Sequence, residues 1–210
     1  MDATLYLDAA EAAEHLIGAP RVAERWTRPS ALEGYTVGAL AGHLARAVLP
    51  VESYLDAPVL DTTEVDAAGY FARVLADHDP VTSELHAAVR ERSRGTAGAG
   101  PAALSDEVGH ARTALAHRLA EERGDRWVAV VDGIVLRLDS YLDTRLVELV
   151  VHLDDLALSV GLPWATGVPD AASERVAAVL ARLACRRQGP IEVVRGLARR
   201  ERHPAPVRAL

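Results

Sequence analysis

Apolar residues recur along most of this chain at intervals of three and four, the spacing of amphipathic helices. Proline and glycine interrupt the pattern near Gly18-Ala-Pro20, over residues 27–34 and over Gly95–Pro101, where we expect a flexible loop. Helices are predicted over residues 5–25 (interrupted near Gly18), 37–49, 67–76, 79–94, 105–123, 140–161, 171–187 and 191–200.

The residues at the predicted helix ends have the chemistry of caps. The helix from residue 37 either stops before Pro50 or continues, kinked, towards Asp56. Gly124 and Gly161 follow predicted C-termini, as glycine commonly does. The predicted N-caps are Thr36, Asp79 (followed by Pro80) and Asp139 or Ser140.

One stretch has a different pattern. In Trp127–Leu136, two pieces rich in β-branched residues flank Asp132-Gly133, a favoured pair for a two-residue hairpin turn. A two-stranded hairpin is not stable alone, so it must pack on the helices. The predicted fold is all-α: a bundle of four main helices over residues 1–165 with a small β-hairpin insertion. A helical C-terminal extension over residues 166–210 packs on the same domain.

Composition agrees with this class and excludes several functions. Half of the 210 residues are hydrophobic but only 4% are aromatic, which favours helices over a β-sandwich. There is no lysine, so Schiff-base, pyridoxal-phosphate and P-loop chemistry are excluded. No apolar run reaches transmembrane length, the N-terminus lacks a signal peptide, and Cys185 is alone, so we expect a cytoplasmic protein that does not bind membranes.

Charge is unevenly distributed. The net charge is −7, which argues against nucleic-acid binding. From residue 182 onwards, however, there are eight arginines against only Glu192 and Glu201. A basic tail on an acidic body is complementary to a second copy of the chain, so a homodimer is expected.

The run Leu146–Leu153 contains two ionisable residues, Glu148 and His152, four positions apart. This spacing places both side chains on one face of a helix and is typical of metal ligands. They belong to a polar stripe in steps of three and four. The stripe is either the solvent face of the helix or the lining of an internal polar cavity, and spacing alone does not decide between them. Its members are Tyr141, Arg145, Glu148, His152 and Asp155.

A third ligand has to come from a facing helix, and His43 is the best candidate. It lies in the apolar segment from Gly38 to Arg46, which also contains Gly42. The two glycines allow a neighbouring helix to approach closely. A histidine on such a face can also be an ordinary core residue. The other histidines have charged or polar neighbours and are expected to be exposed, apart from His15, whose environment is ambiguous.

Two segments that carry these residues resemble a known signature. The first is Trp26-x2-Pro29-Ser30-x-Leu32-x-Gly34-x-Thr36-Val37-Gly38-x-Leu40-x2-His43-Leu44. The second is Leu142-x2-Arg145-Leu-Val-Glu148-Leu-Val-Val-His152-x2-Asp155-Leu156. Together they resemble the mycothiol-dependent maleylpyruvate isomerase N-terminal family, whose members are DinB-like metal-binding four-helix bundles.

The resemblance implies that His43, Glu148 and His152 bind a divalent metal, usually zinc. Three protein ligands leave a fourth position open, as in catalytic zinc sites. A thiol entering that position would be deprotonated and able to add to an electrophile. The implied function is a metal-dependent thiol transferase or cis–trans isomerase that uses mycothiol or a similar thiol and a small electrophile. Alternatives are a non-catalytic metal- or small-molecule-binding bundle and a metal-dependent hydrolase.

Three further residues are candidates for catalysis. Arg46 is one turn beyond His43 and can bind a carboxylate with two hydrogen bonds. Tyr141 and Arg145 can orient the substrate or support the ligands. The two-domain isomerases have a separate C-terminal domain that contributes an arginine, and the residues after the bundle are too few for that domain here.

Overall fold

The computed structural model describes residues 3–59, 64–75, 83–164, 167–199, 201 and 206–210. Its first half contains α1 (Thr4–Ile17), α2 (Pro20–Glu24), α3 (Val37–Ala45), α4 (Val51–Asp56), α5 (Ala67–Leu75), α6 (Glu84–Thr96) and the 3₁₀ turn η1 (Ala97–Ala99). Its second half contains α7 (Pro101–Glu121), β1 (Trp127–Ala129), the 3₁₀ turn η2 (Val131–Gly133), β2 (Val135–Arg137), α8 (Leu138–Val160), α9 (Asp170–Gln188) and α10 (Pro190–Ala198).

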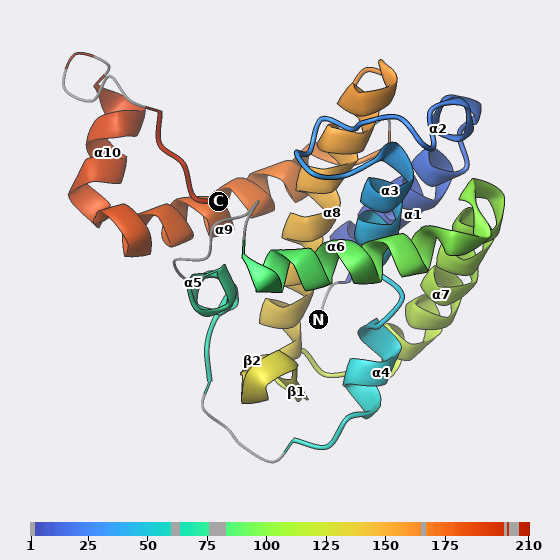
Figure 1. Cartoon of the computed structure of the whole chain (residues 1–210). Helices are drawn as coiled ribbons and strands as arrows, with labels where there is room; N and C mark the ends of the chain where they lie inside the picture. The colour runs from blue at the N-terminus through green and yellow to red at the C-terminus, as the bar shows by residue number, and fades with distance from the viewer. Residues whose placement is uncertain (1–2, 60–63, 76–82, 165–166, 200, 202–205) are drawn as a thin grey trace.

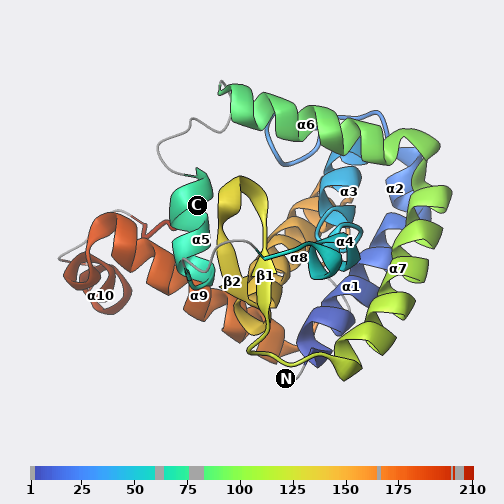
Figure 2. The ribbon, with the colours of Figure 1, turned by 90° about the horizontal axis from the view of Figure 1, so that it is seen from below.

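Helices α1, α3, α7 and α8 form the central bundle (Figures 1 and 2). α1 packs against α7 and α8, and α3 packs against α8 and α6, which runs across the bundle. On the other side of α8, α9 packs against α8 and α5, and α10 packs on the end of α9. The fold is therefore all-α, as predicted, with one small hairpin and two helices, α9 and α10, that come after the bundle in the sequence. None of the described helices is long and apolar enough to span a bilayer.

Several predicted helix ends are confirmed. α3 begins after Thr36, whose Oγ1 accepts a hydrogen bond from the Ala39 amide at 3.1 Å. The first predicted helix is interrupted at Gly18, and Pro20 opens α2. α8 ends at Gly161, which adopts the left-handed conformation with φ of +70°. The helix expected from residue 37 is two separate helices instead, because α3 ends at Ala45, residues 46–50 form turns and α4 begins at Val51.

Other predicted ends are wrong. Neither Asp139 nor Ser140 caps α8, because β2 leads directly into the helix and Arg137 occupies the N-cap position. Residues 95–101 do not form an extended loop, because α6 continues to Thr96, η1 follows, and α7 begins at Pro101. The cap predicted at Asp79 and Pro80 lies outside the described residues, and Ser83 caps α6.

The hairpin is present, but its turn is longer than predicted. β1 and β2 pair antiparallel, with Trp127 opposite Arg137 and Ala129 opposite Val135. Five residues connect the strands, and η2 forms part of this loop, so Asp132-Gly133 is not a two-residue turn. Gly133 nevertheless adopts a positive φ of +71°, which accounts for glycine there.

The hairpin joins the bundle through an ion-pair cluster centred on Glu122. The Glu122 carboxylate accepts hydrogen bonds from Arg126 and, at 2.8 Å, from Arg118 Nε. Arg118 also bonds Asp56 of α4 at 3.0 Å. The side chain of Glu122 is only 13% exposed, and these bonds, chiefly the one from Arg126, lower its pKa below 4.5.

We expect Glu122→Gln to lower the free energy of unfolding by about 1–2 kcal/mol at pH 7. Because the folded-state pKa of Glu122 is depressed, its contribution is complete above pH 4.5 and is lost as pH falls through the folded-state pKa. Urea unfolding at pH 7 and below pH 4 would measure the difference, which should shrink at the lower pH. Glu121→Gln is the matched control, because Glu121 is exposed and forms no ion pair with a described residue.

Candidate metal centre

The polar stripe of α8 faces the inside of the molecule. Tyr141 is almost fully buried, and the side chains of Glu148 and His152 are only 25% and 14% exposed. Arg145 lies beside Tyr70 of α5, and Glu148 lies beside His43 of α3. The stripe is therefore not the solvent face of the helix.

The three predicted metal-binding side chains meet between α3 and α8. His43 Nε2 lies 3.6 Å from Glu148 Oε2, and His152 Nε2 lies 3.4 Å from the same oxygen. The two imidazole rings are 4.6 Å apart and nearly perpendicular. Both histidines thus direct the same nitrogen towards one carboxylate oxygen.

The Nδ1 atom of each imidazole ring contacts a side chain that is not one of the candidate ligands. His152 Nδ1 lies 2.9 Å from Asp155 Oδ2, one turn further along α8. His43 Nδ1 lies 3.3 Å from Ser93 Oγ of α6. The hydroxyl of Ser93 donates its one proton to the Val89 carbonyl at 2.7 Å, so its oxygen accepts from His43 Nδ1–H. Each Nδ1 therefore bears a proton, which leaves Nε2 as the position at which a metal can bind.

This arrangement fits a divalent metal. One ligand atom from each of the three residues lies within 4.8 Å of the others. Zinc–ligand bonds of about 2.0–2.1 Å in a tetrahedron place ligand atoms roughly 3.3 Å apart. The separations of 3.4 and 3.6 Å from Glu148 are close to that value. The donor set of two imidazoles and one carboxylate is also one that binds zinc and leaves a position open.

Without a metal, Glu148, His152 and His43 shift one another's pKa values. Burial opposes the charge on Glu148, but the neighbouring imidazoles, His152 more than His43, hold its pKa well below the ordinary value. Burial also opposes the charge on His152, but Asp155 and Glu148 raise its pKa to about 9, whereas burial lowers the pKa of His43. At neutral pH a metal would therefore displace a proton from His152.

Arg145 extends the site along α8 by one turn. Its Nε donates to Thr144 Oγ1 at 3.1 Å, and its guanidinium lies 5.8 and 5.5 Å from the rings of Tyr70 and Tyr141. The Tyr141 hydroxyl is buried without a hydrogen-bond partner among the described residues. Burial raises the pKa of Tyr70 and of Tyr141, so both phenols stay protonated at neutral pH.

The remaining candidates do not join this cluster. Arg46 is the C-cap residue of α3, and its side chain forms no hydrogen bond or ion pair with a described residue. His15, His110 and His117 are exposed. His86 is half-buried rather than exposed as predicted, while His78 and His203 lie outside the described residues.

Three residues in contact with the site were not predicted. Ser93 and Tyr70 come from α6 and α5, and the Tyr35 ring packs 5.6 Å from that of His43. The sequence does contain a weak signal for Ser93, because Gly42 on α3 indicates a close neighbour. A Cβ on Gly42 would lie 2.1 Å from the Ser93 carbonyl oxygen.

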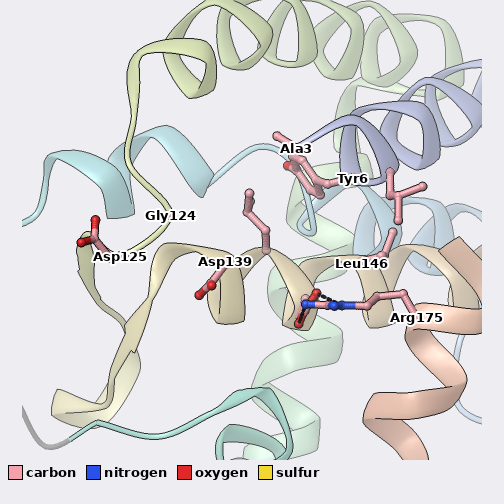
Figure 3. A pocket seen from close by; sticks show the side chains of 10 residues that line it. Ala3, Tyr6, Gly124, Asp125, Asp139, Leu146 and Arg175 are labelled. Atoms are coloured by element: carbon pink, nitrogen blue, oxygen red, sulfur yellow. Dashed lines mark hydrogen bonds and ion pairs between the residues drawn. The ribbon is translucent and has the colours of Figure 1, made fainter. Parts of the chain in front are cut away.

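A separate hollow of about 510 Å³ lies against another face of α8, between α1, α9 and the segment before β1 (Figure 3). Apolar and charged side chains both line it, and Arg175 binds both oxygens of Asp143 at 2.8 and 2.9 Å. Neither His43 nor the ionisable stripe of α8 lines it. The candidate chemistry therefore lies at the His43–Glu148–His152 cluster.

Comparison with known families gives a match to one of them. The family model described as "Mycothiol maleylpyruvate isomerase N-terminal domain" matches residues 6–157, most of the 210-residue chain. The chain belongs to this family. The match to the mycothiol maleylpyruvate isomerase N-terminal domain covers α1 and nearly all of α8, whereas α9 and α10 lie beyond it. No curated protein and no solved structure matches the chain significantly.

Proposed function

We propose that this protein is a metal-dependent enzyme that activates a low-molecular-weight thiol of the mycothiol type for addition to a small electrophile. The metal, which we take to be zinc, is held by His43, Glu148 and His152. The observation that carries the proposal is the convergence of two Nε2 atoms on one Glu148 oxygen, with both Nδ1 atoms held by other side chains. Membership of a mycothiol-linked family supports the choice of thiol.

When bound at these residues, the metal would lower the pKa of a thiol at its open position, so that a thiolate forms near neutral pH. The surrounding residues bind and orient. Asp155 and Ser93 fix the two imidazoles so that both Nε2 atoms keep their direction. The imidazoles are already oriented before the substrates bind, so the activation free energy includes no term for orienting them.

Arg145 and Tyr141 are proposed to position the electrophile. The guanidinium has aromatic rings on its sides and forms no ion pair with a described carboxylate, so it is available for a polar or anionic group of a substrate. The unpartnered Tyr141 hydroxyl is protonated and can donate a hydrogen bond. Arg46 is kept as a candidate for the same role, on its position one turn after His43.

Addition alone makes the protein a thiol transferase, whereas addition followed by bond rotation and loss of the thiol makes it an isomerase. In the second case the thiol is regenerated and only the geometry of the double bond changes. The two outcomes differ in whether thiol is consumed.

The test is turnover of model electrophiles by zinc-loaded protein, with mycothiol, with glutathione and without thiol. With a cis-enoyl diacid, proton NMR would distinguish the cis and trans isomers and mass spectrometry would detect a thiol adduct, so the two together separate isomerisation from transfer. We expect turnover that requires mycothiol and falls about 100-fold or more in Arg145→Ala. Turnover without any thiol would indicate hydrolysis instead, and binding without turnover would indicate a non-catalytic bundle.

A further inference from the structure

α10 exposes an apolar stripe that nothing in the described chain covers. Ile191, Val194 and Leu197 follow one another at intervals of three and are 54%, 57% and 73% exposed. The opposite side of the helix is anchored, because Val193 is buried against α9. Exposed apolar side chains grouped in this way mark an interaction surface more often than isolated ones do.

A second apolar surface lies at the other end of α9. A groove of about 370 Å³ runs between α8 and α9, lined by Val151, Val176, Leu180 and the half-exposed Trp164. Leu158, 67% exposed, continues the same face of α8. Asp154 lies on the edge of the groove and forms no ion pair with a described residue.

The parts of the chain that carry the two surfaces are opposite in net charge. Residues 182–210 contain eight arginines and two glutamates, a net charge of +6, which leaves −13 on the rest of the chain. Arg195 and Arg199, both exposed, flank the stripe of α10, and Arg195 also pairs with Glu192 of the same helix at 2.6 Å. The stripe therefore suits an acidic apolar groove, and the groove beside Asp154 is one.

The geometry places the two surfaces too far apart to meet within one chain. The groove follows the first half of α9, while α10 extends from its far end, away from α8 (Figures 1 and 2). α9 has 19 residues and is about 28 Å long. In a two-fold arrangement with antiparallel α9 helices, each α10 would lie on the side of the other copy's groove.

We infer that the chain forms a symmetric homodimer in which α10 of each copy docks in the α8–α9 groove of the other. A two-fold axis makes the contact twice, which is needed because one short helix in one groove buries less area than stable interfaces do. The apolar stripe supplies most of the affinity, and the arginines opposite Asp154 orient the encounter. The dimer does not depend on the metal or on the proposed reaction.

Sedimentation equilibrium, from micromolar to near-millimolar concentration, tests the inference on the full chain. The expected mass is twice the 22.4 kDa of one chain, with dissociation favoured by added salt. Leu197→Glu should weaken the dimer about 30-fold or more, and Asp154→Arg should weaken it from the groove side. Circular dichroism should show unchanged helix content in both variants, because both residues are exposed.

The matched control is Leu85→Glu, an exposed leucine of α6 outside both surfaces, which should leave the dimer intact. A monomer at every concentration would overturn the inference, as would a dimer that survives either Leu197→Glu or Asp154→Arg. Binding of a monomeric protein to phosphatidylserine vesicles would assign the stripe to a lipid surface and would also overturn it.

Discussion

Replacing His152 with alanine is expected to weaken zinc binding by about three orders of magnitude, whereas Asp155→Asn weakens it only 10–100-fold. His152 supplies one of three ligand atoms, and no other described histidine lies near enough to replace it. Asp155 does not contact the metal position but holds the His152 ring by its Nδ1 atom at 2.9 Å. Competition with a chromophoric chelator would measure both affinities, and His43→Ala should match His152→Ala.

The control for this series is His110→Ala, which removes an exposed histidine of α7. Its zinc affinity and its content of about one ion per chain should equal those of the unsubstituted protein. If purified protein neither contains nor takes up a metal, the cluster is a buried hydrogen-bonded network and the proposed reaction is wrong. Equal affinity in Asp155→Asn would instead contradict the role given to Asp155 alone.

The sequence predicts the residues of this site better than their surroundings. Glu148 and His152 are related by helix periodicity, a local property, and His43 is distinguished by the glycines beside it. The direction in which the stripe of α8 faces depends on how α3 and α5 pack, and local spacing does not encode packing. Ser93 and Tyr70 were missed for the same reason, since each comes from a helix whose position is set by tertiary contacts.

The fold, too, is predicted well where the signal is local and less well where tertiary contacts decide. Helices with long amphipathic periods, such as α8 and α9, agree with the prediction to within a few residues. The errors lie at junctions, where a neighbour overrides a local signal. Arg137 replaces Asp139 as the cap of α8 because the hairpin fixes the entry of the chain. The glycines over residues 95–101 do not form an open loop, because this segment packs against α3 around Gly42.

The contact between α3 and α6 at Gly42 gives the largest expected effect on stability. We expect Gly42→Ala to lower the free energy of unfolding by about 3 kcal/mol. The new Cβ would lie 2.1 Å from the Ser93 carbonyl oxygen and 3.0 Å from the Ala97 Cβ. A backbone atom cannot rotate away as a side chain can, so α6 has to move from α3. That movement would lengthen the Ser93–His43 hydrogen bond and reduce zinc affinity in protein that is still folded.

The matched control is Gly95→Ala, on α6 and with open space around the added Cβ. Alanine favours the helix over glycine by about 0.5–1 kcal/mol, so this variant should be slightly more stable and bind zinc normally. Ser93→Ala separates the two effects of Gly42→Ala, because it removes the hydrogen bond without moving the helix. Urea unfolding and chelator competition on all three variants give the comparison. If Gly42→Ala has the stability and zinc affinity of the unsubstituted protein, then α6 is free to shift, and the tight α3–α6 contact does not position His43.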